Sequence, residues 1–480
     1  MKWIFIVNNS SFFPEFFAKL AGQAIEQGDE CLIAMNSKIV EFTKKKVFPD
    51  KAKIISRVDW CVENYKSDRK EFGDLSWKEL FPTFDRYKPS GFFNYNNSFN
   101  IISQTHQFFE FLFQQEKPDA IIGEPPAGLF HEIAYSFCRK NNIPYFGLGS
   151  SRFEGRLDIY DLEFTFSKYE KTFKEIKDTD ISEKEKKFVQ NFIQKFISNE
   201  NLPSYFKLGI AGSYLTQFNI FTYYIKRIIK EVPFLLSCFL KIKNFKNFDY
   251  ETEIALRYAL VTPWRAERRK IRTLFQKNIF SKTSNSDIFF FYPLQGPPEA
   301  STSIWATYYS DQLSTIKNIA FALPFPYKLY IKEHPGCIGL RPGSFYKKLK
   351  ELPNAVLISP HENVRQIVKK SSAVITLTGT IGMEAALAGK ITYVLGNVSY
   401  FYHPLCQKIK NFEELKDKIK NDLINKPSVD NLEDINCRFI VSCFRNTIKG
   451  SIISVGQKED INDYKLIYLS LKKYAISKLP

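Results

Sequence analysis

A regular alternation of apolar, strand-like segments with helix-like segments between residues 288 and 423 constrains the fold more than any other feature. Strands are expected at 288–292, 327–332, 355–358, 373–377 and 391–395, with helices at 312–323, 363–369, 381–388 and 412–423. Short, continuously apolar strands separated by helices are typical of a parallel sheet covered on both faces. The second half of the chain is therefore predicted to form a doubly wound α/β domain.

A weaker form of the same pattern opens the chain. A strand at 3–7, a helix at 13–27 and a strand at 30–35 are followed by a strand at 119–122, a helix through Arg139 and a strand near 144–148. Between 166 and about 275 the strand signals fade and charged helical segments replace them. We expect an α/β protein of two Rossmann-like domains with a helical insertion: 1–165, a helical basic region at 166–275, 276–455, and a C-terminal helix at 456–480.

The composition limits the classes of partner. Among 480 residues, 68 Lys and Arg against 51 Asp and Glu give a net charge of +17, which favours anionic partners, and the 16% of aromatic residues excludes a disordered chain. No basic arm or RNA-binding signature is present, so nucleic acid is not expected. The eight cysteines form no CxxC pair and are expected to be reduced thiols.

The opening apolar run is short, and Asn8 ends it, so it is interpreted as a strand rather than a signal peptide. No segment approaches the roughly 20 apolar residues of a membrane-spanning helix. We expect a cytoplasmic protein that is soluble or peripheral to the cytoplasmic face of the inner membrane. A basic amphipathic pattern at 215–232, with Lys226, Arg227 and Lys230, indicates either a helix packed on the core or a helix on a membrane surface.

Ligands of parallel α/β sheets bind beyond the carboxyl ends of the strands, so the loops there are the places to look for a site. In the second half these loops contain Gln295, then Glu333, His334 and Pro335, and then Thr378-Gly379-Thr380. The last of them offers hydroxyls and backbone N–H groups at a helix start, where the helix dipole favours a phosphate.

Each of these residues also has a structural interpretation. Thr380 can be an N-cap only, and Glu384, which is placed to accept hydrogen bonds from ribose hydroxyls, can be only a favourable first-turn acid. His334 can pair with a phosphate as a cation, hydrogen-bond to one as a neutral ring, or be structural.

No histidine spacing suggests a metal site, since His361 and His403 form no triad with His334. The P-loop, the GxGxxG fingerprint and the GxSxG elbow are absent, which argues against a nucleotide-hydrolysing motor, a dehydrogenase and a serine hydrolase.

In the first half, Glu124 follows the strand at 119–122, where it is either a general base or a solvated loop acid. Other polar residues at strand ends are candidates for acceptor binding: Asn8, Asn9, Ser10, Arg152 and Arg156. The two arginines can equally be loop residues without a ligand.

Three segments carry a family resemblance: FYPLQGPPEAS at 291–301, YKLYIKEHPGCIGLRPGSFY at 327–346 and VITLTGTIGMEAALAGK at 374–390, with a weaker one in IPYFGLGSSRFEGR at 143–156. In this order they resemble the bacterial capsule polysaccharide biosynthesis family, which includes β-Kdo transferases. The resemblance covers the second half of the chain well and the first half weakly.

The resemblance implies a GT-B architecture, in which two Rossmann-like domains face a cleft and the C-terminal one binds a nucleotide-sugar donor. It implies that His334 and Thr378-Gly379-Thr380 meet the phosphate of a CMP-activated acidic sugar, with Glu384 near the nucleotide ribose or base. Gln295, Glu333 and Pro335 belong to the same implied donor site. Gly296 after Gln295 departs from the Gln-Pro form of some Kdo transferases, which leaves the identity of the donor open.

The leading hypothesis is a metal-independent glycosyltransferase without a cofactor. It would transfer Kdo or a sialic-acid-like sugar from CMP to a glycan or lipid-linked acceptor, with Glu124 and His334 as catalytic residues. A UDP-sugar transferase or epimerase shares the expected fold and phosphate site. A non-catalytic polysaccharide export or assembly protein is the alternative outside enzymes.

Overall fold

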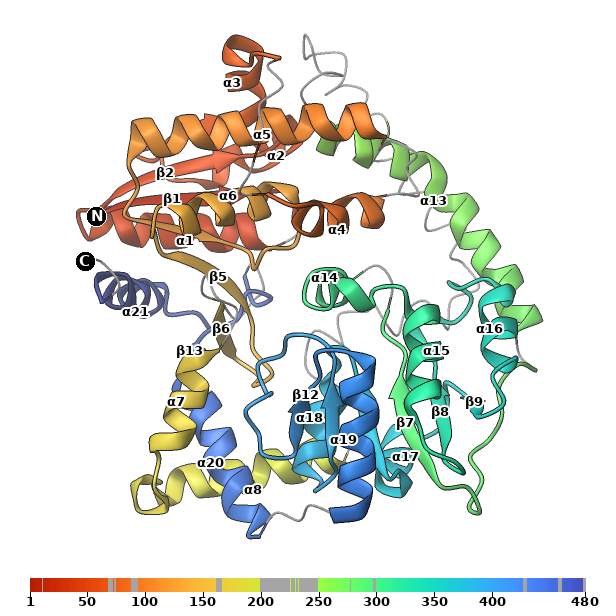
Figure 1. Ribbon diagram of the computed structural model, residues 1–480. Helices are drawn as coiled ribbons and strands as arrows, with labels where there is room; N and C mark the ends of the chain where they lie inside the picture. The colour runs from red at the N-terminus through yellow and green to blue at the C-terminus, as the bar shows by residue number, and fades with distance from the viewer. Residues whose placement is uncertain are drawn as a thin grey trace. The chain divides into compact units, whose positions relative to one another are not determined.

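A computed structural model describes the chain with gaps (Figure 1). The described residues are 1–10, 12–67, 72, 75–87, 94–160, 166–198, 225, 229, 232, 249–276, 278–296, 299–425, 430–455 and 460–477. Two compact units divide it: the first comprises Met1–Phe164, Phe221–Pro263 and Thr447–Pro480, and the second comprises Thr165–Ile220 and Trp264–Asn446.

The first unit contains a seven-stranded sheet in the order β13-β6-β5-β4-β1-β2-β3. Its strands β1, β2, β3, β4 and β5 run parallel, whereas β6 and β13 are antiparallel additions at one edge. The strands are β1 (Lys2–Val7), β2 (Glu30–Met35), β3 (Lys53–Ser56), β4 (Ala120–Gly123), β5 (Tyr145–Ser150), β6 (Arg156–Tyr160) and β13 (Ile448–Lys449).

Helices cover both faces of this sheet, because successive side chains of a strand point to opposite faces and both sets are apolar. On β1, Trp3 and Phe5 pack in the core with α1 (Phe13–Glu26) and α21 (Tyr464–Ile476). Ile4 packs on the other face with α5 (Tyr95–Glu116) and α6 (Leu129–Lys140). Shorter helices complete the unit: α2 (Lys38–Lys44), η1 (Lys45–Val47), α3 (Arg57–Asn64) and α4 (Trp77–Tyr87).

The second unit contains a parallel six-stranded sheet in the order β12-β11-β10-β7-β8-β9. Its strands are β7 (Phe289–Pro293), β8 (Lys328–Lys332), β9 (Ala355–Ile358), β10 (Ala373–Thr376), β11 (Thr392–Val394) and β12 (Cys406–Lys408).

Both faces of the second sheet are apolar as well. Phe290 and Tyr292 of β7 pack in the core with α15 (Gln312–Ala322), α16 (Gly343–Lys350) and α19 (Phe412–Asn425). Phe289 and Phe291 pack with α17 (Val364–Lys370) and α18 (Thr380–Leu387) on the opposite face. The remaining described elements are α7 (Ser167–Glu175), η3 (Asp178–Asp180), α8 (Glu183–Ser198), α14 (Ala300–Ser303), η4 (Thr307–Tyr309), η5 (Pro335–Cys337) and α20 (Leu432–Arg445).

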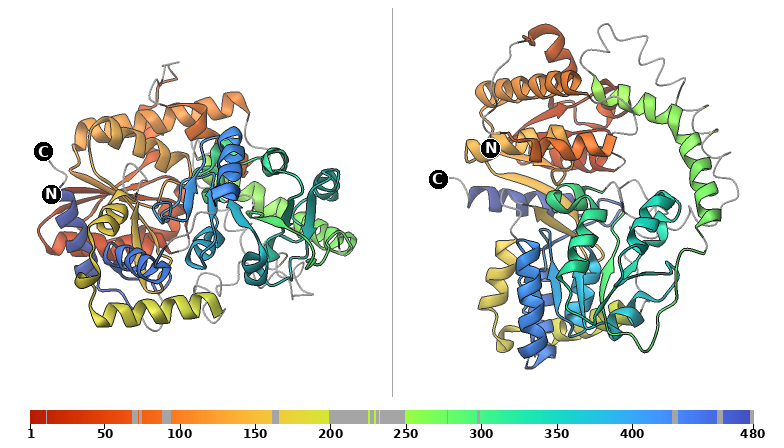
Figure 2. Two further views of the ribbon diagram at one scale, coloured as in Figure 1. Left: turned by 60° about the horizontal axis from the view of Figure 1, so that its bottom comes forward. Right: turned by 45° about the vertical axis from the view of Figure 1, so that its right-hand side comes forward.

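One long helix, α13 (Tyr250–Phe275), appears as a light-green ribbon in the right-hand view of Figure 2. The division between the two units falls within it, after Pro263. Because a proline in a helix interior has no N–H to donate, this position lacks one backbone hydrogen bond.

The predicted α/β class with two parallel sheets is confirmed, and each predicted strand has an observed counterpart whose ends lie within two residues of it. Strands β3, β6, β12 and β13 were not predicted. The units differ from the expected domain limits, since Thr447–Pro480 groups with the first unit and the expected insertion is shared between both. The amphipathic segment 215–232 lies outside the described residues except at Ile225, Ile229 and Val232, and its basic residues Lys226, Arg227 and Lys230 are not described.

Candidate functional site

Three predicted site loops of the second unit follow neighbouring strands. Strand β7 pairs with β8 on one side and with β10 on the other, both in parallel. The loops after β7, β8 and β10, which contain Gln295, His334 and Gly379, therefore leave the same edge of the sheet side by side.

Two glycines show how closely these loops pack. A Cβ atom at Gly379 would lie 2.8 Å from Gln295 Nε2, and one at Gly296 would lie 3.2 Å from Cys337 Sγ. The loop after β7 thus touches both of the other loops, and residues without a side chain allow this approach.

The start of α18 has no side-chain cap. Gly379, rather than Thr380, is the N-cap residue, and its own N–H donates to Thr376 Oγ1 at 3.2 Å. The side chain of Thr378 is 3% exposed, yet its hydroxyl makes no hydrogen bond with any residue that the structure describes. Because buried hydroxyls normally have a partner, this hydroxyl and the uncapped helix start suit an anionic ligand.

His334 is held as a neutral ring. Its Nδ1 accepts a hydrogen bond from Gly336 N at 3.1 Å, and burial lowers its pKa below the ordinary value. The ring proton therefore resides on Nε2, which is a hydrogen-bond donor. Of the two ligand-binding interpretations of His334, the structure favours the neutral donor over the cation.

Glu333 is engaged within the protein. Its carboxylate accepts hydrogen bonds from Arg341 Nη1 at 2.6 Å, from Tyr346 Oη at 2.6 Å and from the backbone N–H of His334 at 2.8 Å. Both Glu333 and Arg341 are buried. The arrangement favours a positioning role for Glu333 over the predicted nucleotide contact.

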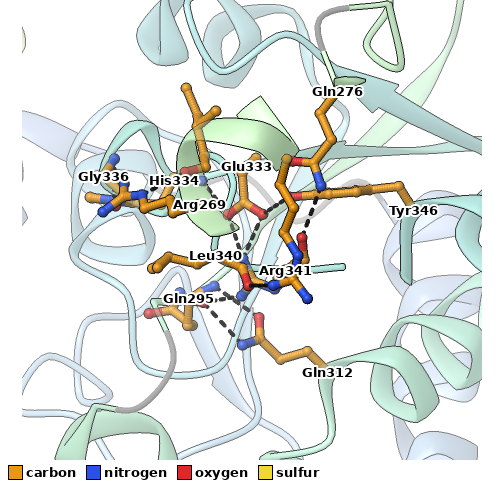
Figure 3. A network of polar contacts seen from close by, with 12 residues as sticks. Arg269, Gln276, Gln295, Gln312, Glu333, His334, Gly336, Leu340, Arg341 and Tyr346 are labelled. Carbon is orange, nitrogen blue, oxygen red and sulfur yellow. Dashed lines mark hydrogen bonds and ion pairs between the residues drawn. The ribbon is translucent and has the colours of Figure 1, made fainter. Parts of the chain in front are cut away.

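Arg341 connects the loops after β7 and β8 (Figure 3). Its Nη2 donates to the carbonyl oxygen of Gln295, while Nη1 is bound to Glu333. The side chain of Gln312 holds Gln295 further, accepting from its N–H at 2.9 Å and donating to its carbonyl at 3.0 Å. The backbone of Gln295 is therefore fixed where its side chain meets Gly379.

The last turns of α13 hold the loop after β8 through its carbonyl groups. Arg269 donates to Gly336 O at 2.7 Å and to Ile338 O at 2.9 Å, and Arg272 donates to Leu340 O at 2.8 Å. Gln276 adds a hydrogen bond to Arg341 O at 2.9 Å.

Gly339, at the middle of this loop, has φ +76°, and a Cβ there would lie 2.5 Å from Arg269 O. Only glycine fits this contact without displacing the helix or the loop.

Two further residues that were predicted to bind the nucleotide-sugar donor lie in the same unit. Pro335 begins the short helix η5, and Glu384, on α18, lies 3.6 Å from Arg365 in an ion pair. A nucleotide contact by either residue stays a prediction.

The predicted residues of the first unit gather at the carboxyl edge of its own sheet. Asn8, Asn9 and Ser10 follow β1, and Glu124 follows β4, which pairs with β1. Asn8 Oδ1 and Ser10 Oγ are buried without a hydrogen bond to the described part of the chain.

The loop that bears Glu124 is anchored by the hydroxyl of Tyr145, which donates to Glu124 O at 2.6 Å. A Cβ at Gly147 of β5 would lie 2.9 Å from Pro125 Cα, so this loop also packs directly on the neighbouring strand.

The two predicted arginines differ in their surroundings. Arg152 lies in the turn between β5 and β6. The guanidinium of Arg156 donates to Thr447 Oγ1 at 2.8 Å and to Thr447 O at 2.6 Å, which ties β6 to the residue before β13. Arg156 therefore has a structural contact, and nothing in the structure adds support for its predicted acceptor role.

Among the described residues, no cluster of three or more His, Cys, Asp or Glu side chains could hold a metal ion. Within the same residues, no helix combines the length and apolar character needed to cross a membrane.

Sequence reasoning missed Arg341, Gln312 and Arg269 as supports of the site. Arg341 stands in a quoted motif, but no periodicity marks an arginine that pairs with a carboxylate eight positions earlier. Arg269 belongs to a different element and contacts the loop across almost 70 positions of sequence, which a single chain does not reveal.

The fold and the site define a class: an α/β protein of two parallel-sheet units, with polar loops converging at the carboxyl edge of the second sheet, where such folds bind ligands. Residues 239–423 match the family model described as capsule polysaccharide biosynthesis protein. The matched residues include the three motifs of the second half, so the match confirms their resemblance to this family.

Solved structures give more distant similarities. Two structures of KpsC from Thermosulfurimonas dismutans, a β-Kdo 2,7 transferase and a β-Kdo 2,4 transferase, are similar to this chain. Their sequences are 12% and 10% identical to it, with TM-scores of 0.33 and 0.35. They cover 77% and 67% of this chain and 89% and 79% of their own chains. The UDP-GlcNAc 2-epimerase of Methanocaldococcus jannaschii is 11% identical with a TM-score of 0.26, covering 93% of this chain and 99% of its own. No curated protein matches the chain.

Proposed function

We propose that this chain is a glycosyltransferase of surface-polysaccharide synthesis, which transfers a sugar from a nucleotide-activated donor to a glycan or lipid-linked acceptor. The observation that carries the proposal is the convergence of three loops from the adjacent strands β10, β7 and β8. These loops carry the neutral imidazole of His334, the uncapped start of α18 and the buried hydroxyl of Thr378. All three are groups that bind a phosphate without a metal ion.

The donor that we propose is a CMP-activated acidic sugar such as Kdo or a sialic-acid-like sugar. One helix N-terminus and one imidazole donor match the single phosphate of a CMP-sugar. The histidine-proline motif at 327–346, which resembles that of transferases using CMP-activated acidic sugars, supports the same class of donor.

In the proposed reaction the loops after β8 and β10 stabilise the leaving phosphate. The acceptor oxygen forms a bond to the anomeric carbon of the sugar as the bond from that carbon to the nucleotide phosphate breaks. The nucleotide leaves with negative charge on its phosphate oxygens, which the Nε2–H of His334 and the N-terminal end of the α18 dipole stabilise. Glu124 is the proposed base that takes the proton of the acceptor hydroxyl, with Asn8 and Ser10 as acceptor contacts.

The experiment that tests this function is an assay of sugar release from CMP-Kdo, CMP-sialic acid, UDP-sugars and GDP-sugars by the full-length protein. Donor hydrolysis is expected with the CMP-sugars, because water substitutes for the acceptor. Sugar release from UDP-sugars alone would show that the donor is a UDP-sugar, and it would still support a transferase. Conversion of a UDP-sugar to its epimer, or no turnover and no binding of any nucleotide, would overturn the proposal.

A further inference from the structure

The exposed side of α13 carries a stripe of large apolar residues. The exposed fractions are 61% for Leu260, 73% for Trp264, 54% for Ile271, 65% for Leu274 and 82% for Phe275. The spacings of 4, 7, 3 and 1 positions place all five within about 100° of the helix circumference, at 100° per residue. Single exposed apolar residues are ordinary on proteins, whereas an aligned set on one helix marks an interaction surface.

Contacts on the opposite side of the helix determine which face is exposed. Arg269 and Thr273 point to the loop after β8, where Arg269 binds two carbonyl oxygens and Thr273 Oγ1 would lie 2.4 Å from a Cβ at Gly339. Ala266 is buried. The apolar stripe is therefore not the side with which α13 packs on the second unit.

Basic residues flank the stripe. The segment 264–275 contains one acidic residue, Glu267, and five Lys and Arg residues, of which Arg269 and Arg272 bind the loop after β8. Arg268 is exposed beside Trp264 and Ile271, while Lys270, on the other flank, pairs with Glu267 at 2.9 Å. Exposed Trp, Leu and Phe side chains bordered by Arg and Lys are the composition of helices that lie in the interface of an anionic bilayer.

We propose that this face of α13 docks the protein onto an anionic lipid surface. Apolar side chains would enter the boundary between headgroups and acyl chains, and Arg268 with its basic neighbours would meet the lipid phosphates. A protein partner could bind the apolar stripe without contacting the basic residues beside it, whereas an anionic lipid surface would bind both. The charge pattern therefore favours lipid as the partner. This inference does not depend on the proposed transferase activity.

The test is co-sedimentation of the full-length protein with phosphatidylglycerol–phosphatidylcholine vesicles and with pure phosphatidylcholine vesicles. Trp264→Ser and Arg268→Glu are expected to lower binding to the anionic vesicles by about tenfold, because each removes a component of the interfacial contact. The matched controls are Trp77→Ser, at another exposed tryptophan, and Lys348→Glu, at an exposed lysine of α16. Both controls are expected to bind like the wild type.

Thermal unfolding of every variant verifies that the fold is retained. Absence of wild-type binding to anionic vesicles would overturn the proposal, as would equal losses in the α13 variants and their controls. A change in the molar mass of the free protein on Trp264→Ser, with vesicle binding unaltered, would assign the face to contact between copies and would also overturn it.

Discussion

At the residue scale, the protonation state of His334 determines what it can contribute to the site. Its Nδ1 is occupied by Gly336 N–H, and its lowered pKa keeps the ring neutral at pH 7. A neutral hydrogen bond contributes about 0.5–1.5 kcal/mol, less than a charge-assisted one. His334→Ala should therefore weaken nucleotide binding roughly 2- to 10-fold by calorimetry, whereas His361→Ala, at an exposed histidine after β9, should leave it unchanged. A loss of about a hundredfold would indicate a bound imidazolium instead.

The ion pair of Glu333 and Arg341 also belongs to this scale, because it holds the loops on which His334 and Gln295 lie. Removing one partner of a buried ion pair leaves the other charge uncompensated, at a cost of about 3–5 kcal/mol. Arg341→Met should lower the free energy of unfolding by about that amount in urea titrations. The double variant with Glu333→Gln should recover part of the loss, and a double variant less stable than Arg341→Met would contradict this account.

At the scale of elements, most strands and helices of both sheets could be predicted from the sequence. Strands such as β7 and β10 are continuous apolar runs, and α15 and α18 follow them at the spacing of βαβ units. Four strands were missed: β3, β12 and β13 are short strands at sheet edges, and β6 is an antiparallel strand next to β13. The two residues of β13 acquire a strand conformation only by pairing with a segment almost 300 positions earlier.

The loops of the candidate site could be predicted because each directly follows a strand, but their supports could not. Whether Thr380 or Gly379 caps α18 depends on backbone angles, and the capping residue proves to be Gly379. The contacts of Arg269 with Gly336 and Ile338 join elements with no local pattern in common.

Because α13 contacts the loop after β8, we expect alanine substitutions at two glycines to differ sharply in their effect on stability. Gly339→Ala places a Cβ against Arg269 O at positive φ and should cost about 1–3 kcal/mol of the free energy of unfolding. The matched control is Gly343→Ala, since nothing lies within 4 Å of a Cβ at Gly343, the first residue of α16. Its effect should stay within about 0.5 kcal/mol, and equal effects of the two substitutions would show that this contact is dispensable.

At the scale of the whole molecule, stability should depend on pH through a buried carboxyl group in the first unit. Burial raises the pKa of Glu251 to about 7, and the neighbouring carboxylate of Asp249 acts in the same direction. Since the unfolded value is near 4.5, the folded state binds more protons between these two pH values. The free energy of unfolding should therefore fall as the pH rises from 4.5 to 7, by at most about 3 kcal/mol.

Glu251→Gln should remove this decrease, so the variant should be more stable than the wild type at pH 8 and similar to it at pH 4.5. Glu253→Gln, two positions further along α13, serves as the control and should keep the wild-type dependence of stability on pH in urea titrations across this range. A Glu251→Gln profile parallel to that of the wild type would show that Glu251 ionises normally.

The central claim, that the loops after β7, β8 and β10 bind the donor phosphate, is tested most directly by calorimetric titration of Thr378→Val. The substitution removes a buried hydroxyl that has no partner among the described residues, so the free energy of unfolding should be unchanged or higher. The account predicts that the affinity for the nucleotide that the wild type binds best among CMP, UDP and GDP falls roughly 2- to 10-fold. An affinity equal to that of the wild type would contradict the claim.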